Sequence, residues 1–350
     1  MFVKPDPSVF REELDPAPGA PAPVAVARFK LCAAVDVSLI KSYSEMIVKY
    51  GKSNKKIVAL DADLILDTGL IEFKNKFPNR FFECGIAEQD MVSKAGGMAL
   101  TGMLPIVHSF SSFLSARPNE QIYNNASEGN KIIYVGSLAG LLPAGPGHSH
   151  QAVRDISNIG SIPNIYVIEP SCAEELDQIL DWGINKSERS IYIRLNSLAT
   201  EINFKYPTKN VFRIGEGFSV KKGKDAIMFT YGPMMLNEVL KTRKLLIKEK
   251  QFYLEIVNLS SLNFINSNWL KKKIKPHENI FCLDNHYIVG GLGDRLSCLI
   301  SSFNVNKKFI NLGLEKFPEC GTNDEILKYH SMDYKSISKK ILKISKKFYE

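Results

Sequence analysis

The sequence predicts an α/β fold made of two doubly wound domains. From about residue 36 onward, short apolar runs rich in Ile, Val and Phe alternate with segments of helical periodicity. This alternation is typical of parallel sheets covered by helices. The runs form two sets that meet near residues 200–215. A length of 350 residues allows two cores, because a single core usually stops growing at roughly 250 residues.

The first domain is expected over residues 36–205. Residues 1–35 differ from it in composition, since six of the 17 prolines fall within the first 30 residues. We interpret this head as a flexible arm or a foreign extension. A helical stretch over residues 36–50 opens the domain. Its strands are predicted from the apolar runs at 56–63, 102–110, 131–138, 164–170 and 190–196.

The second domain is expected over residues 206–350 and is the smaller of the two. Its strands are predicted at 225–232, 252–260, 279–285 and 308–314. We interpret it as a dimerisation and scaffolding domain, with His286 in a structural or interfacial position. The "GGLG" stretch at 290–293 is a weak signal for an anion site at a helix start.

Composition excludes several classes of protein. No apolar run reaches the roughly 20 residues of a membrane span, and the first residues lack the apolar core of a signal peptide, so a cytoplasmic protein is expected. The net charge is +8, but the lysines are scattered without interleaved aromatics, which argues against nucleic acid. The charge is either a solvated surface or a field that attracts anionic substrates. The six cysteines show no CxxC spacing, so neither a zinc site nor a disulfide framework is predicted.

Three stretches carry candidate chemistry. Glu88 stands where a loop turns into an apolar helix, a position in which a carboxylate is also a simple partner of the helix dipole. Phe110 and Phe113 are spaced i, i+3 at a strand-to-helix junction and could equally be core residues. The glycine-rich stretch "GPGHSHQ" offers His148 and His150.

In their order along the chain, these stretches resemble the C-terminal half of transketolases. Deoxyxylulose-phosphate synthase and the beta subunits of 2-oxoacid dehydrogenases share this half in outline. The resemblance covers nearly everything after residue 36, and its strength lies in the common order, since each stretch alone is weak. The matching stretches are "ALDADL" (59–64), "FFECGIAEQDM" (81–91), "HSFSSF" (108–113), "GPGHSHQAVRDI" (145–156), "IYIRLN" (191–196), "LDNHYIVGGLG" (283–293) and the closing "GTNDEILKYHSMDYKSISKKI".

The resemblance implies a pyrimidine-binding domain for thiamine diphosphate, followed by a transketolase C-terminal-like domain. In this family the glutamate at the position of Glu88 contacts N1′ of the aminopyrimidine ring and activates the cofactor. Phe110 and Phe113 match aromatic residues that stack on this ring. Asp63 and Leu64 match a segment that lines the same pocket, at the end of a strand.

For the substrate, the resemblance favours His150 over His148, because "HSHQ" aligns with a family histidine that contacts the reacting sugar. Arg194 matches an arginine that holds a substrate phosphate, although an arginine paired with a structural acid is the alternative. The sequence also departs from the family. Transketolases carry a histidine and an aspartate where this chain has residues near Leu138 and Pro146, so the usual phosphorylated ketoses are in doubt.

The diphosphate end of the cofactor needs a "GDG" segment and Mg²⁺ ligands, and the sequence has no such constellation. The resemblance therefore implies one subunit of a split, thiamine-diphosphate-dependent transketolase, transferring a two-carbon ketol unit between sugars, which are sugar phosphates or modified sugars. An N-terminal-type partner subunit would bind the diphosphate and Mg²⁺ in an α2β2 heterotetramer. The alternatives are a 2-oxoacid dehydrogenase beta-like subunit, a deoxyxylulose-phosphate-synthase-like subunit and a non-catalytic interaction subunit.

Overall fold

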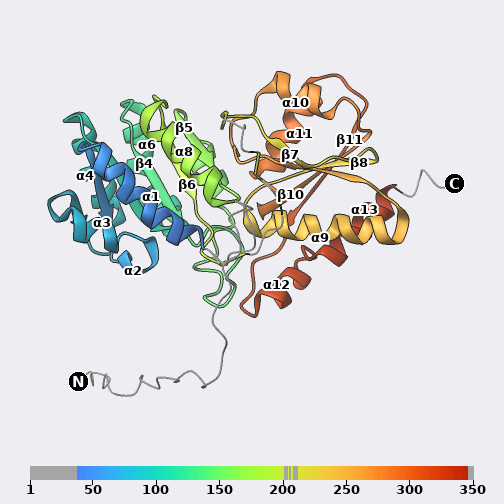
Figure 1. The fold of residues 1–350 in the computed structure, drawn as a ribbon, viewed down its shortest axis with the longest axis horizontal. Helices are drawn as coiled ribbons and strands as arrows, with labels where there is room; N and C mark the ends of the chain where they lie inside the picture. The colour runs from blue at the N-terminus through green and yellow to red at the C-terminus, as the bar shows by residue number, and fades with distance from the viewer. Residues whose placement is uncertain (1–37, 201–203, 205, 208–211, 346–350) are drawn as a thin grey trace, which may run out of the picture. The chain divides into compact units, whose positions relative to one another are not determined.

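A computed structural model describes residues 38–200, 204, 206–207 and 212–345. The head expected at residues 1–35 and part of the expected boundary near 200–215 lie outside these described residues. The described residues belong to one compact unit. It contains two sheets, each flanked by helices (Figure 1), so the predicted α/β fold with mostly parallel sheets is confirmed.

The first sheet has six strands in the order β2-β1-β3-β4-β6-β5. Every neighbouring pair is parallel, so all six carboxyl ends lie at one edge. The strand β2 is only three residues long and was not predicted, because so short a run has no visible period. The strands are β1 (Ile57–Asp61), β2 (Phe81–Glu83), β3 (Leu104–Phe110), β4 (Ile133–Ser137), β5 (Ile165–Ile168) and β6 (Ser190–Arg194).

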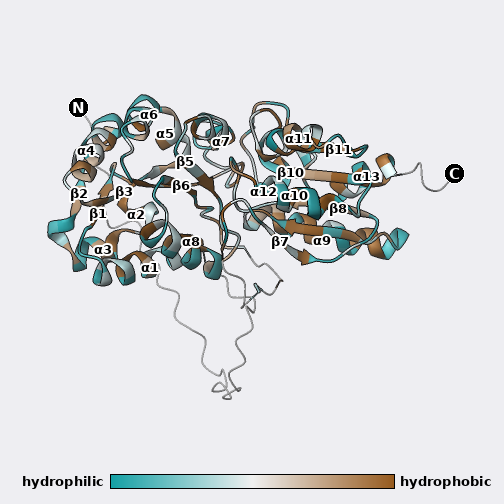
Figure 2. Cartoon of the chain, turned by 90° about the horizontal axis from the view of Figure 1, so that it is seen from above, coloured by the Kyte–Doolittle hydropathy of each residue, from teal (hydrophilic) through white to brown (hydrophobic). Residues whose placement is uncertain are grey.

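Helices cover both faces of this sheet, in two rows that Figure 2 shows on opposite sides of the strands. The helices α4 to α7 pack on one face and α1, α3 and α8 on the other. Strand β1 serves both cores, because Val58 and Leu60 join the first while Ile57 and Ala59 join the second. The helices are α1 (Leu39–Ser53), α2 (Ile65–Thr68), α3 (Ile71–Lys76), α4 (Glu88–Leu100), α5 (Ser111–Ala116), α6 (Asn119–Ser127), α7 (Asp155–Gly160) and α8 (Ala173–Asn185), with the 3₁₀ turn η2 (Pro78–Arg80).

The second sheet has five strands in the order β11-β10-β8-β9-β7. It is parallel except for the edge strand β7, which pairs antiparallel with β9 and was not predicted. The helices α9, α12 and α13 pack on one face, and α10 and α11 on the other. The elements are β7 (Phe218–Lys221), β8 (Ala226–Thr230), α9 (Pro233–Lys250), β9 (Leu254–Asn258), α10 (Ser267–Ile274), β10 (Asn279–Tyr287), α11 (Leu292–Ser302), β11 (Lys308–Leu314), α12 (Asn323–Tyr329) and α13 (Tyr334–Ser345).

Local sequence explains where several helices begin. The Ser38 side chain accepts a hydrogen bond from the backbone N–H of Ile40 and caps α1, and Asn266 caps α10 in the same way. Thr322 and Glu325 form a reciprocal capping box at the start of α12. Such caps satisfy backbone donors that have no partner within the helix.

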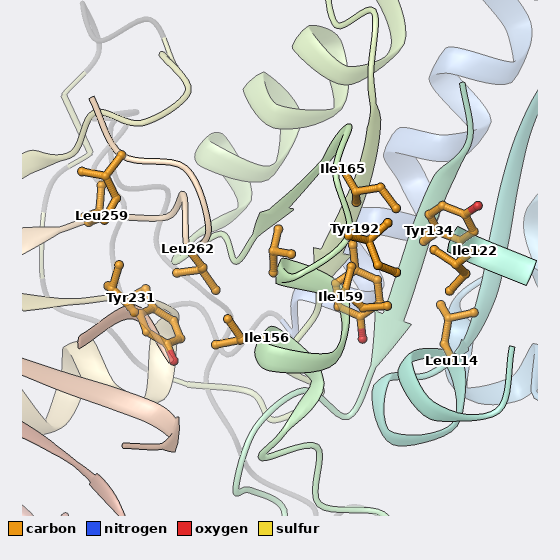
Figure 3. Close-up of a cluster of buried hydrophobic side chains, with 14 of the residues drawn as sticks. Leu114, Ile122, Tyr134, Ile156, Ile159, Ile165, Tyr192, Tyr231, Leu259 and Leu262 are labelled. Carbon is orange, nitrogen blue, oxygen red and sulfur yellow. The ribbon is translucent and has the colours of Figure 1, made fainter. Parts of the chain in front are cut away.

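The two domains share one apolar cluster, part of which is drawn in Figure 3. Ile156 and Ile159 of α7 belong to it together with Tyr231, Leu259 and Leu262 of the second domain. All five side chains are buried, at most 2% exposed. This continuous packing holds the loop before α7 against the second domain.

None of the helices in the described part of the chain combines the length and the hydropathy that a membrane crossing needs.

Candidate active site

The candidate residues gather at the carboxyl edge of the first sheet. Strands β1 to β4 all end at this edge because they are parallel. Asp63 follows β1, Glu88 follows β2 and Phe110 ends β3. The loop with both histidines follows β4. This is the edge at which α/β sheets place ligands.

Glu88 is the first residue of α4, and its side chain is only 4% exposed. The guanidinium of Arg117, just after α5, donates a hydrogen bond to Glu88 Oε1. The helix N-terminus favours a negative charge there as well. The carboxyl is therefore poorly solvated, as predicted, but in this structure an ion pair satisfies it.

An aromatic cluster lies next to this ion pair. The rings of Phe110 and Phe113 have centroids 5.6 Å apart, and the His150 ring lies 5.9 Å from Phe110 and 5.2 Å from Phe113. The Arg117 guanidinium sits 3.8 Å over the Phe113 ring. Glu88, Arg117, Phe113, His150 and Phe110 thus form one continuous cluster, which brings together four of the predicted site residues.

The turn after β1 lies beside the loop that leads to Glu88. The exposed Asp63 adopts a left-handed backbone with φ 63°, which is uncommon for a residue other than glycine. Its N–H donates to Glu83 Oε1 at 2.8 Å, and the N–H of Gly85 donates to the same oxygen at 3.0 Å. Glu83 thereby ties the two loops together. No described contact joins the Asp63 side chain to the aromatic cluster, so its cofactor role remains a prediction.

Asp61, the last residue of β1, stabilises this turn, and the sequence analysis did not predict this role. Its carboxylate accepts hydrogen bonds from the N–H of Leu64 at 2.6 Å and from the Thr68 hydroxyl at 2.7 Å. Burial raises the pKa of Asp61 to about 6, and the two hydrogen bonds oppose the shift. Leu64 is half-buried and its backbone is fixed by this contact.

The second domain anchors the loop that carries the histidines. The N–H of Leu141 donates to Asn285 Oδ1 at 2.9 Å, and the N–H of Tyr287 donates to the carbonyl of Val153 at 3.0 Å. Within the loop, His150 Nδ1 lies 2.9 Å from the Ser149 hydroxyl. His148 is exposed. The loop is therefore positioned by both domains, and its histidine at 150 faces the phenylalanines.

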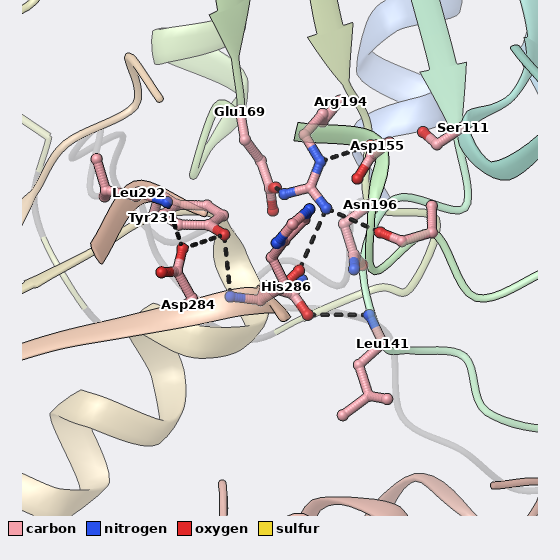
Figure 4. Close-up of polar contacts among 12 residues, drawn as sticks. Ser111, Leu141, Asp155, Glu169, Arg194, Asn196, Tyr231, Asp284, His286 and Leu292 are labelled. Atoms are coloured by element: carbon pink, nitrogen blue, oxygen red, sulfur yellow. Dashed lines mark hydrogen bonds and ion pairs between the residues drawn. The ribbon is translucent and has the colours of Figure 1, made fainter. Parts of the chain in front are cut away.

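The structure does not match the interpretation of Arg194 as a phosphate-binding residue. Its side chain has no exposed surface. Nε donates to Asp155 Oδ2 at 2.8 Å, Nη1 to Glu169 Oε2 at 2.5 Å, and Nη2 to the carbonyls of Ala152 and Asn285 (Figure 4). A guanidinium enclosed in this way presents no donor to a substrate, so the structure matches the alternative of an arginine paired with structural acids.

The corresponding edge of the second sheet is closed by the chain itself. The N–H groups of Leu292 and Gly293, at the start of α11, donate to the Asp284 carboxylate at 3.0 and 2.7 Å. The Tyr231 hydroxyl donates to the same carboxylate at 2.9 Å. The anion site suggested by "GGLG" is therefore occupied by an internal carboxylate. His286 is fully buried and accepts a long hydrogen bond, 3.4 Å, from the N–H of Ser157 in the first domain.

Sequence reasoning missed Arg117, the partner of Glu88. Its position four residues after Phe113 is a usable signal, because residues i and i+4 of a helix share a face. The structure also locates the two positions at which the sequence departs from transketolases. Leu138 follows β4 with a left-handed backbone of φ 54°, and Pro146 is exposed in the histidine loop.

The residues at the first edge fit the ring end of thiamine diphosphate, since a buried carboxylate stands beside two phenylalanine rings. They do not extend to its charged end. Across the described ranges, no group of three or more His, Cys, Asp or Glu side chains could hold a metal ion.

Comparisons with known proteins identify both domains. The family model for the transketolase pyrimidine binding domain matches residues 36–201, and that for the transketolase C-terminal domain matches residues 215–337. A Methanocaldococcus jannaschii protein named as a transketolase C-terminal section is 33% identical over 309 residues, 88% of this chain and 96% of that protein.

Two further comparisons bear on the extent of the match. The 1-deoxy-D-xylulose-5-phosphate synthase of Clostridium tetani is 31% identical over 310 residues, 88% of this chain but 49% of the synthase. The chain thus spans about half the length of that relative. A solved structure titled as a split gene transketolase, inactive beta4 tetramer, superposes with a TM-score of 0.79 at 25% identity, covering 88% of this chain and 98% of the other.

Proposed function

The chain belongs to the transketolase family, and on this premise we propose that it is one subunit of a thiamine-diphosphate-dependent transferase that moves a two-carbon ketol unit between sugars. The observation that carries the proposal is the buried carboxylate of Glu88 at the start of α4, beside the rings of Phe110 and Phe113. A carboxyl group with so little water around it favours a partner with which it can share a proton.

Glu88 would bind the ring nitrogen of the cofactor's aminopyrimidine and hold a proton there. In the free chain the Arg117 guanidinium donates to Oε1 of Glu88, which leaves the second carboxylate oxygen for the ring nitrogen. Phe110 and Phe113 would support the ring by stacking. Thiamine diphosphate itself would supply the nucleophilic carbon and the electron sink.

His150 would face the substrate from the other side of the phenylalanines. Its ring contacts both of them, and its loop is held by hydrogen bonds to the second domain. An imidazole in this position can accept or donate a proton at a sugar hydroxyl while the carbon–carbon bond is cleaved or formed. His150 is therefore assigned to proton transfer and substrate orientation.

A second subunit would complete the site. No described group of this chain offers a constellation for Mg²⁺, and the M. jannaschii relative carries the name of a C-terminal section alone. The split transketolase structure is titled an inactive tetramer of beta chains. These comparisons support a separate N-terminal-type partner. In the proposal this partner holds the diphosphate and Mg²⁺, and closed twofold symmetry would give an assembly with two copies of each chain.

The test is reconstitution. The purified chain, an N-terminal-type transketolase subunit encoded in the same genome, thiamine diphosphate and Mg²⁺ are mixed with a ketose donor and an aldose acceptor. Ketol transfer is expected from the mixture and from neither chain alone. Transfer by this chain alone, or cofactor binding by the complex without turnover of any sugar, would contradict the proposal.

One alternative has a specific observation in its favour. The C. tetani synthase is 31% identical to this chain, so a synthase-like subunit that condenses pyruvate with an aldehyde is the second candidate. The same reconstituted complex decides between them, because release of carbon dioxide from pyruvate on addition of an aldose phosphate is expected of the synthase and not of a ketol transferase.

A further inference from the structure

A pocket of about 270 Å³ lies on the histidine loop. Its walls come from Ser112 and Ser115 of α5, from residues 148, 149 and 151–154 of the histidine loop, from Asp155 at the start of α7, and from Tyr287, Phe317 and Pro318 of the second domain. Its volume is close to the lower end of the roughly 300–1,000 Å³ found for small-molecule sites. Phe113 and His150 do not line it themselves, but residues adjacent to them in the sequence do.

Four residues that line this pocket carry unpaired polar atoms. The hydroxyls of Ser112 and Ser115, Gln151 Oε1 and Asp155 Oδ1 are buried without a hydrogen-bond partner among the described residues. Ser115, Gln151 and Asp155 are at most 4% exposed. Buried polar groups are destabilising when they remain without a partner. Two hydroxyls and two acceptor oxygens are a set that suits a ligand rich in hydroxyl groups.

Arg154 adds a positive charge to the same wall. It is exposed, and no described acidic side chain forms an ion pair with it. Arg194, forty residues later, is enclosed by two carboxylates and two carbonyls. Arg154 also acts on Tyr287 across the pocket, where burial raises the pKa of the tyrosine and the nearby Arg154 charge opposes the rise. Arg154 is therefore the guanidinium at this site with free donors.

We propose that Arg154 is the specificity-determining residue that binds the anionic group of a small hydroxylated substrate in this pocket, in place of Arg194. This inference rests on the proposed function for its choice of sugars. Its physical basis is that a planar guanidinium binds phosphate or carboxylate through two parallel hydrogen bonds, while the orphaned hydroxyls and acceptors pair with the sugar hydroxyls.

The first experiment uses the reconstituted complex with one ketose donor and two acceptors, ribose 5-phosphate and ribose. Arg154→Gln should raise KM for ribose 5-phosphate by about tenfold or more, as expected for loss of a charged hydrogen bond, with kcat and the constants for ribose unchanged. Arg154→Lys, which keeps the charge but not the fork, should fall between. Arg189→Gln, the same change at an exposed arginine before β6, lies at the opposite edge of the sheet and should leave every constant unchanged.

Two results would overturn the inference: no change in the ratio of the two KM values, or an equal loss for both acceptors. Ribonate, with a carboxylate in place of the phosphate, serves as a competitor and shows which anion the pocket prefers. Stronger competition by ribonate than by ribose 5-phosphate would assign the site to sugar acids.

A second experiment separates this inference from the proposed function. All the pocket's lining residues belong to this chain, so ribose 5-phosphate binding is measured on the full chain alone by saturation-transfer NMR. Binding to the wild type that is lost in Arg154→Gln and kept in Arg189→Gln would support the pocket even if the complex transferred no ketol unit. Equal signals from all three proteins would overturn it, whatever the activity of the complex.

Discussion

The two sheets of this chain have the same kind of parallel topology but treat their carboxyl edges in opposite ways. At the edge of the first sheet, the acid at a helix start, Glu88, pairs with a half-exposed arginine beside aromatic rings and an open pocket. At the edge of the second, Asp284 is enclosed by Tyr231 and by the first turn of α11. The fold supplies a helix N-terminus at each edge, and the side chains decide which one is available to a ligand.

Buried contacts between the two domains help to position the open edge. Arg194, which ends β6 of the first sheet, joins Asp155 at the start of α7 to Glu169 after β5 and to the backbone of Asn285 in the second domain. Asn285 in turn holds the loop that carries His150, through Leu141. Buried charges that are paired in this way can fix one arrangement of loops. The comparison therefore assigns chemistry to the open edge and positioning to the buried contacts with the second domain, and the following substitutions test that division.

The largest effect is expected at the open edge. Glu88→Gln keeps the shape of the side chain but cannot hold a proton on the ring nitrogen, so kcat of the reconstituted complex should fall by about 10²–10⁴-fold, the range for loss of an acid–base group. Thermal unfolding should change little, because the acid is not needed for packing. The matched control is Asp90→Asn. Asp90 lies two residues after Glu88 in α4 and is exposed beside Lys94. A Glu88→Gln complex with more than half of the wild-type kcat would place the chemistry elsewhere.

At the buried contact between the first sheet and the second domain, removal of Arg194 should damage folding rather than substrate recognition. Arg194→Met leaves the buried carboxylates of Asp155 and Glu169 without a counter-charge, and breaking such a buried pair costs about 3–5 kcal/mol. Urea unfolding of the chain measures the loss. Arg213→Met is the control. It removes an exposed ion pair to Glu216 elsewhere in the chain and should cost under about 1 kcal/mol. A stable Arg194→Met protein with a raised KM for phosphorylated sugars would restore the phosphate-binding interpretation.

Much of the fold could be predicted from the sequence because its central strands are buried on both faces. Runs such as residues 57–61 and 133–137 are mostly apolar and buried throughout, which is the pattern of an interior parallel strand. The strands β2 and β7 were missed for the opposite reason. They lie at the sheet edges, are three and four residues long, and have mixed exposure that carries no clear period.

The site could be predicted where local sequence determines position and not where tertiary packing does. Glu88, Phe110, Phe113 and His150 each follow a strand, so the parallel topology alone brings them to one edge. The outcome for Arg194 depended on Asp155 and Glu169, which lie 39 and 25 residues away in the sequence, and no local pattern announces such a pair. Arg154 was missed because its proposed role depends on the lack of an ion-pair partner among the described residues, and the sequence does not show such a lack.

A smaller loss of stability is expected from opening the second edge. Asp284→Ala would leave the N–H groups of Leu292 and Gly293 and the Tyr231 hydroxyl buried without an acceptor, at a cost of about 2–4 kcal/mol. Urea unfolding provides the value. Asp294→Ala is the control, since Asp294 accepts the N–H of Gly290 in the same turn but is exposed and should cost less than about 1 kcal/mol. Equal costs for the two variants would mean that the edge is not closed in solution.

The smallest effect concerns Glu175, which joins the two edges. Its carboxylate accepts the N–H of Ser171 at 2.7 Å and the side chain of Asn258, from the end of β9, at 3.0 and 3.1 Å. Burial raises the pKa of Glu175 to about 7, above its ordinary 4.5, and the hydrogen bonds oppose the shift. Between these two pKa values the folded chain holds a proton that the unfolded chain has lost. This contribution to stability is therefore present below pH 4.5, falls as the pH rises to 7, and changes no further above that.

Glu175→Gln removes this titration, so the difference in unfolding free energy between the variant and the wild type should shift by about 2–3 kcal/mol in favour of the variant from pH 5 to pH 8. Taking the difference cancels the contribution of His108, which has the opposite trend. Burial lowers the pKa of His108 to about 4, so its contribution to stability is lost as the pH falls below the pKa of this group in the unfolded chain. If Glu175→Gln gives a difference that is flat over this range, water reaches the carboxylate and the junction between the two edges is open.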